Sequence, residues 1–130
     1  MFEKTYAFSG FAVNDVSAAK QFYGETLGVT VEERGDMGLA LKLGSGAEVF
    51  IYPKKGHQPA TYTILNFVVD DIEDTVQQLV SKGVTFEHYD LGNGAKTDEM
   101  GIMRGKTAHM GPDIAWFKDP AGNVLSVIEN

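Results

Sequence analysis

Hydrophobic and polar positions in the first half of the chain switch from strand spacing to helix spacing and back. A strand is predicted over about Tyr6 to Val13. A helix follows over Val16 to Leu27, where apolar residues recur every three or four positions. Asp15 or Ser17 can accept a backbone hydrogen bond at its start, and Gly28 ends it. Short strands separated by glycines are then predicted over Thr30–Glu33, Leu39–Leu43 and Glu48–Tyr52.

The second half of the chain repeats this order. A strand is predicted over Tyr62–Val69 and a helix over Ile72–Lys82, with Asp70 and Glu73 at the spacing of a capping box. Val13 and Val68 end matching segments and lie 55 positions apart, which indicates two copies of one supersecondary unit. Further strands are predicted over Phe86–Tyr89, Ile114–Phe117 and Val124–Ile128.

Two segments fall outside the repeat. Pro53–Pro59 contains two prolines and no apolar periodicity, so we predict a connector there. Leu91–Pro112 is long and rich in glycine and methionine, which is typical of a lid over a binding site or of a flexible surface loop. The expected organisation is a single domain over residues 1–130, with module one at about 5–53, the connector at 54–61 and module two at about 62–130.

Composition narrows the function classes. The chain has 18 acidic and 11 basic residues, a net charge of −7 and no basic cluster, so we expect no nucleic-acid binding. It contains no cysteine, which excludes disulfides and thiolate chemistry. No apolar run reaches the roughly 20 residues of a membrane helix, and no secretory signal is evident, so we expect a cytoplasmic protein without membrane association.

The motifs of both halves resemble one known family. They are Val13-x-Asp15, Gln21-Phe22-Tyr23 and Leu27-Gly28 in the first half, and Val68-x-Asp70, Lys82-Gly83-Val84 and Trp116-Phe117-Lys118-Asp119-Pro120-Ala121-Gly122-Asn123 in the second. The chain thus resembles the vicinal oxygen chelate superfamily, which includes glyoxalase I, extradiol dioxygenases and bleomycin-resistance proteins. The resemblance implies an α+β fold in which two βαβββ modules form an open, cleft-containing barrel. It also implies a homodimer.

The resemblance further implies a divalent metal held by His or Gln on the first strand and Glu on the last strand of the modules. The matching positions are occupied by Phe8, Thr63, Ser126 and Val49, the last flanked by Glu48 and Phe50. Phenyl and isopropyl groups cannot ligate, and neutral hydroxyls are poor ligands, so we expect no metal and no cofactor. The alternative is a displaced metal site that uses Glu48 with two of His57, His88 and His109.

These observations favour a metal-independent small-molecule-binding protein, similar to bleomycin-resistance-type members, that binds an aromatic or cationic organic ligand in the cleft. No catalytic residue is predicted. Trp116 would be a stacking platform, unless it and Phe8 simply fill the core. The predicted ligand-binding residues are Phe8, Phe50, Thr63, Met103, His109, Trp116 and Ser126.

Two other functions stay open at this stage. One is a glyoxalase-like lyase, isomerase or dioxygenase with a relocated divalent-metal site. The other is a partner-binding or assembly role, in which the sheets serve mainly as a dimer interface.

Overall fold

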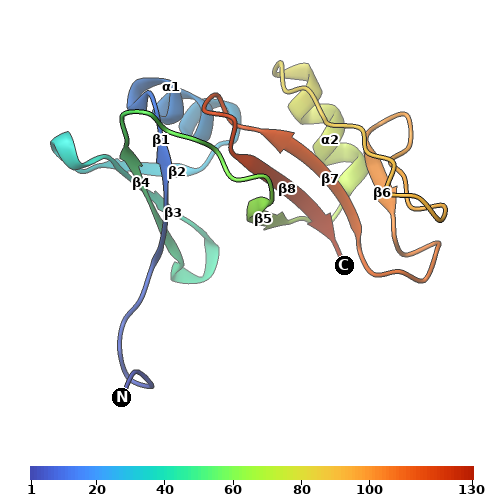
Figure 1. Ribbon diagram of the computed structural model, residues 1–130, viewed down its shortest axis with the longest axis horizontal. Helices are drawn as coiled ribbons and strands as arrows, with labels where there is room; N and C mark the ends of the chain where they lie inside the picture. The colour runs from blue at the N-terminus through green and yellow to red at the C-terminus, as the bar shows by residue number, and fades with distance from the viewer. The chain divides into compact units, whose positions relative to one another are not determined.

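The computed structural model describes all 130 residues, which form two compact units, Met1–Pro59 and Ala60–Asn130 (Figure 1). Each unit has one four-stranded mixed sheet with helical segments. The order of elements in each unit is strand, helix and three strands. The predicted α+β class and its two βαβββ modules are therefore confirmed. No helix of the chain has both the length and the apolar character needed to cross a membrane.

The first unit is built on a sheet in the order β1-β4-β3-β2. β1 runs parallel to β4, and the other pairs are antiparallel. The predicted helix is divided, because α1 is followed by one π-helical segment, Phe22–Thr26, that closes with a bond from the Leu27 N–H to the Phe22 carbonyl. The elements are β1 (Ser9–Val13), α1 (Val16–Gln21), β2 (Thr30–Glu33), β3 (Leu39–Lys42) and β4 (Glu48–Pro53), with 3-10 turns at Gly35–Met37 and Gly44–Gly46.

One face of the first sheet supplies the core of its unit. Asp15 begins α1 by accepting a hydrogen bond from the Ala18 N–H at 3.1 Å, which satisfies one of the free donors of the first turn. α1 packs on the central strand β4, and the π-helical segment contacts β2. The fully buried side chains of this core are Val13, Leu39, Leu41 and Ile51 from the strands and Ala19 and Tyr23 from the helical segments.

The second unit repeats the topology with the order β5-β8-β7-β6. β5 runs parallel to β8, as β1 does to β4, and α2 packs on β7 and β8. Its core lies between α2 and the sheet, where Phe117 and Leu125 are fully buried. The elements are β5 (Thr63–Val68), α2 (Ile72–Ser81), β6 (Ile102–Arg104), β7 (Asp113–Lys118) and β8 (Val124–Glu129).

The second strand of this unit lies elsewhere than predicted. The expected strand Phe86–Tyr89 contributes one isolated bridge, from Phe86 to Phe117, and the strand that completes the sheet is β6. β6 lies inside the segment predicted as a lid or loop. It pairs with β7 because Ile102 is fully buried there, whereas three residues give too short an alternation to be recognised in the sequence.

The spacing between equivalent residues of the two units increases by one between the first strand and the helix cap. The first-strand positions Phe8 and Thr63 correspond at the predicted spacing of 55. α2 begins at Ile72 as predicted, but its N-cap residue is Asp71, not Asp70. The Asp71 carboxylate accepts the Asp74 N–H at 3.0 Å. A register shift between Thr63 and Leu65 adds the extra residue, because Ile64 there has no partner of its own on β8.

The turn between β7 and β8 fixes how these strands pair. The buried Asp119 carboxylate accepts the N–H groups of Ala121 and Asn123, each at 2.9 Å, and the Asn123 side-chain amide at 3.0 Å. These bonds satisfy polar groups that would be costly to bury unpaired. The Asp-Pro-Ala-Gly-Asn motif is therefore a structural device that sets the hairpin register.

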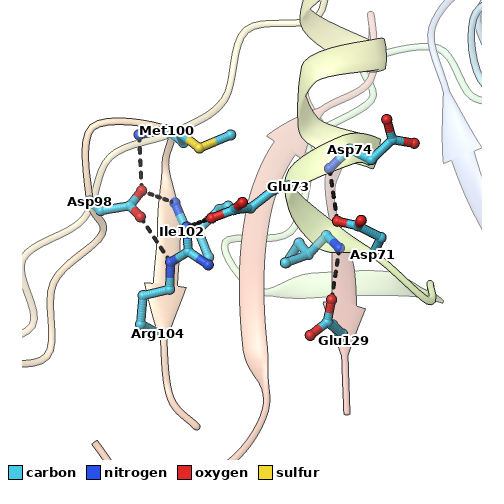
Figure 2. Close-up of polar contacts among 9 residues, drawn as sticks. Asp71, Glu73, Asp74, Asp98, Met100, Ile102, Arg104 and Glu129 are labelled. Carbon is cyan, nitrogen blue, oxygen red and sulfur yellow. Dashed lines mark hydrogen bonds and ion pairs between the residues drawn. The ribbon is translucent and has the colours of Figure 1, made fainter. Parts of the chain in front are cut away.

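A polar network attaches the middle of the long segment Leu91–Pro112 to α2 (Figure 2). Asp98 accepts the N–H groups of Met100 and Ile102, each at 2.9 Å, and its other oxygen accepts the Arg104 Nε at 3.0 Å. Arg104 also donates to Glu73 at 2.6 Å. Burial alone would raise the pKa of Asp98, but the Ile102 N–H, the Arg104 guanidinium and the Met100 N–H outweigh it and lower that pKa.

We expect Asp98→Asn to destabilise the second unit by about 1 kcal/mol, because the new amide group would face the Arg104 donor while the two backbone bonds remain. The lowered pKa means that Asp98 stabilises the fold above its ordinary pKa of 3.8, and that this contribution is lost as the pH falls through the lowered value. The variant should therefore show a weaker loss of stability below about pH 4. Denaturant unfolding at several pH values measures the loss of stability and its pH dependence. The exposed Asp36→Asn is the control. Equal stability of the Asp98 and Asp36 variants would show that the network does not stabilise the fold.

Candidate functional site

One face of the second sheet carries side chains that are not used by the core. Asn66, Ser126 and Trp116 lie side by side across β5, β8 and β7, because Asn66 pairs with Ser126 and Ser126 with Trp116. Paired residues point to the same side of a sheet, and this side is opposite to the one covered by α2. The two neighbouring rows on the same side are Thr63, Val124 and Lys118, and Val68, Ile128, Ile114 and Met103. We call this surface the Trp116 face; it comprises Thr63, Asn66, Val68, Met103, Ile114, Trp116, Lys118, Val124, Ser126 and Ile128.

Hydrogen bonds fix the polar groups of the Trp116 face. The hydroxyl of Ser126, which is fully buried, donates to the Asn66 Oδ1. The Trp116 Nε1 donates to the Thr63 Oγ1 at 3.0 Å. The Tyr89 ring meets the Trp116 ring edge-on, with centroids 5.4 Å apart. Trp116 is thus held in one orientation and remains partly exposed, which is the arrangement a stacking platform needs.

The corresponding face of the first sheet is aromatic. Phe8 precedes β1 and is 60% exposed, and its ring meets the Phe50 ring edge-on with centroids 6.4 Å apart. The Phe50 ring stacks against Tyr52 at 6.3 Å. Gly10, the partner of Phe50 on β1, has no side chain to cover that ring. The face therefore offers aromatic contact area around Phe8 and Phe50.

Glu48 lies on the same aromatic face and is already paired. It accepts Lys42 Nζ at 2.8 Å and an Arg34 Nη at 3.0 Å. The hydrogen bond from Lys42 lowers the pKa of Glu48, and the charge of Arg34 adds to this effect. Within each unit, no three His, Asp and Glu side chains gather where they could hold a metal ion. A displaced site on Glu48 would have to break both of its ion pairs.

The sheet register corrects one of the predicted positions. Val49 was expected to match Ser126, but Val49 is buried on the core side of β4. Gly10 and Asn66 each lie five residues before their helix cap, and their strand partners are Phe50 and Ser126. Phe50 is therefore the residue that corresponds to Ser126, and Glu48 points to the same side as Phe50.

The side chains at the four matching positions do not fit a divalent metal. Phe8 and Phe50 carry no lone pair. The Thr63 hydroxyl already accepts the indole N–H, and the Ser126 hydroxyl already donates to an amide oxygen. Hard cations favour several charged or carbonyl oxygens and imidazole nitrogens, none of which these positions supply.

The seven predicted ligand-binding residues fall into three groups. Four of them, Thr63, Met103, Trp116 and Ser126, lie together on the Trp116 face. Phe8 and Phe50 touch each other on the first sheet. His109 does not belong to the Trp116 face; it lies in an exposed turn after β6, where its backbone has a φ of 54° and its N–H donates to the Lys106 carbonyl.

Sequence reasoning missed two residues of the Trp116 face and its border. Asn66 is the exposed amide beside Ser126, and Tyr89 is the ring that supports Trp116. Asn66 could have been recognised as a polar residue inside an otherwise apolar strand. Tyr89 carries no such signal, because its segment was assigned to a strand that the structure does not form.

Comparisons with known proteins agree on one family. A family model described as the Glyoxalase/Bleomycin resistance protein/Dioxygenase superfamily matches residues 6–127. No curated protein matches the chain.

Solved structures with the same fold cover nearly the whole chain. A glyoxalase family protein from Enterococcus faecalis is 27% identical, with a TM-score of 0.63 over 99% of this chain and 100% of that one. A putative glyoxalase family protein from Bacillus anthracis is 20% identical, with a TM-score of 0.69 over 100% and 99%. TnmS3, an antibiotic binding protein from Streptomyces sp. CB03234, is 21% identical, with a TM-score of 0.61 over 97% of each chain.

The bond between Trp116 and Thr63 can be measured by a double-mutant cycle. Trp116→Phe keeps a ring but removes the N–H, and Thr63→Val removes the acceptor at nearly constant volume. We expect a coupling free energy of about 1 kcal/mol in denaturant unfolding. Trp116→Phe combined with Thr107→Val, an exposed threonine in the turn after β6, should be additive. A coupling of zero for the first pair would show that the bond does not hold Trp116 in place.

Proposed function

The chain belongs to the Glyoxalase/Bleomycin resistance protein/Dioxygenase superfamily, and from this premise we propose that it is a metal-independent small-molecule-binding protein. Its ligand is an aromatic or cationic organic molecule, and it binds by stacking on Trp116. The proposal rests on the side chains at the four positions that match the family's metal ligands. Two of them are phenyl groups, Phe8 and Phe50, and two are hydroxyls that are already hydrogen-bonded, Thr63 and Ser126.

The Trp116 face has the properties that such a ligand needs. A partly exposed indole ring offers a flat apolar surface, and its bonded N–H and its contact with Tyr89 restrict its movement. A ring that is ordered before binding loses little conformational entropy when the ligand stacks on it. Met103, on the edge strand β6, adds adaptable apolar contact.

The aromatic surface of the first unit supports the same class of ligand. Phe8, Phe50 and Tyr52 form a continuous series of ring contacts that leaves much of Phe8 exposed. Exposed aromatic clusters of this kind are a frequent feature of binding surfaces. TnmS3, whose fold the chain shares, is described as an antibiotic binding protein, which is compatible with a role in sequestering an organic compound.

Trp116 is the one tryptophan of the chain, so its fluorescence reports on the proposed site directly. We expect at least one planar aromatic dye from a neutral, cationic and anionic series to quench it saturably in the presence of EDTA. Trp116→Phe should weaken the binding of that dye by about fivefold to tenfold in calorimetry, because the smaller ring loses stacking area.

The matched control is Phe2→Leu, which alters another exposed aromatic residue and should leave affinity unchanged. Failure of every dye to perturb Trp116 would overturn the proposed function.

The alternative is an enzyme with a relocated divalent-metal site at Glu48, and its ion pairs with Lys42 and Arg34 weigh against it. Protein purified without chelator should therefore contain less than about one tenth of an equivalent of any divalent ion by elemental analysis. A stoichiometric ion that is retained by the wild type and lost in Glu48→Gln would favour the enzyme instead. Asp36→Asn serves as the control for the loss of a surface carboxylate.

We also propose that the protein is a cytoplasmic homodimer, as expected from the sequence. Light scattering at micromolar concentration measures the solution mass, and a monomeric mass would contradict the dimer. This part of the proposal is independent of the Trp116 face.

A further inference from the structure

We propose that the Trp116 face selects an aromatic ligand that carries hydrogen-bond acceptor oxygens, such as a ring carbonyl, and discriminates against cationic ligands. This inference rests on the proposed function and narrows it. It comes from the direction of the hydrogen bonds on the face, since a polar group that is already paired on one side can offer only its remaining donor or acceptor to a ligand.

Asn66 presents a donor. Its Oδ1 is occupied by the Ser126 hydroxyl, so the amide of this exposed side chain offers mainly its Nδ2 hydrogens outward. Ser126 is fully buried and its hydroxyl donates to the Asn66 Oδ1, so it holds the Asn66 amide in this orientation. The amide nitrogen makes no hydrogen bond within the protein, and it lies in the same row as Trp116.

Thr63 presents a second donor. Its Oγ1 accepts the Trp116 Nε1 at 3.0 Å, and its own hydroxyl hydrogen remains available. Trp116 therefore offers its ring face for stacking, while its N–H is already used. A planar ligand on that ring would find donors on two sides, at Asn66 and at Thr63, whereas the oxygen atoms of both groups already accept one hydrogen bond each.

The charges of the face point the same way. Lys118 is the one charged residue among the ten that define the Trp116 face, and it pairs with Glu87 at 3.3 Å. No carboxylate belongs to the face. A cationic ligand on Trp116 would gain a cation–π contact, but it would lie beside amide and hydroxyl donors and a lysine, with no unpaired negative charge to attract it.

Two tricyclic probes with the same ring framework test the selectivity. Acridone is neutral and carries a ring carbonyl, whereas 9-aminoacridine carries an amino group at that position and is cationic at neutral pH. With EDTA present, we expect the wild-type protein to bind acridone about tenfold more tightly than 9-aminoacridine, since one satisfied hydrogen bond and one unfavourable charge separate the two. Fluorescence anisotropy of the probes measures both affinities.

Asn66→Asp reverses the polarity of the face with almost no change in shape. The new carboxylate still accepts the Ser126 hydroxyl, so the buried bond is kept, but the outward donor becomes an acceptor with a negative charge. We expect acridone to bind about fivefold to tenfold more weakly and 9-aminoacridine to bind more tightly by a similar factor. Asn93→Asp makes the same change of net charge at an exposed position in the segment between α2 and β6, and should alter neither affinity by more than about twofold.

A gain of affinity for 9-aminoacridine in Asn66→Asp cannot arise from misfolding, so this arm shows that the variant protein is intact. The inference is overturned if the wild type prefers 9-aminoacridine, or if Asn66→Asp binds both probes as the wild type does. It is also overturned if neither probe binds. Equal binding of the two probes with quenching of Trp116 would overturn the selectivity and leave the proposed function standing.

Discussion

The pairing of β7 with β8 is the constraint on which the Trp116 face depends. In the observed register Trp116 lies opposite Ser126, and Phe117 lies opposite Leu125 in the core. The buried bonds of Asp119 and Asn123 close the hairpin that sets this register. A slip of one residue would exchange the two sides of the strand, so that the indole would enter the core and Phe117 would leave it.

The duplicated sheets have acquired different chemistry on equivalent positions. Across the first sheet the central row reads Gly10, Phe50 and Ala40, and across the second it reads Asn66, Ser126 and Trp116. Both cores face their helices, so burial constrains the same side of each sheet. The sheet faces opposite the helices do not form these cores, so their side chains can differ between the units. One has become an aromatic surface, and the other a stacking surface bordered by oriented amide and hydroxyl groups.

The parts of the fold that local sequence determines were predictable. The α+β class, both helix starts near an aspartate and most strands follow from short-range periodicity and turn chemistry. The extra residue at Ile64 and the strand β6 were not, because both depend on partners distant in the chain: β8 for the bulge, and β7 for Ile102. The same difficulty shifted the helix cap from the predicted Asp70 to Asp71.

The site was predictable in composition but not in arrangement. Thr63, Trp116 and Ser126 were singled out, and the structure places them together because β5 and β7 both pair with β8. The predicted position Val49 lies one residue before the correct position on β4, and only the pairing of Gly10 with Phe50 reveals this. Asn66 emerged from its bond to Ser126, which no sequence pattern specifies.

The most direct test is an NMR titration of 15N-labelled protein with acridone in the presence of EDTA. Trp116 is the only tryptophan, so its indole N–H gives a single assignable signal, and the Asn66 side-chain amide can be assigned with Asn66→Asp. If the protein binds aromatic acceptors through its own side chains, these two signals shift together and saturate at one equivalent. If they stay fixed while other signals move, or if they move only after a divalent ion is added, the account is contradicted.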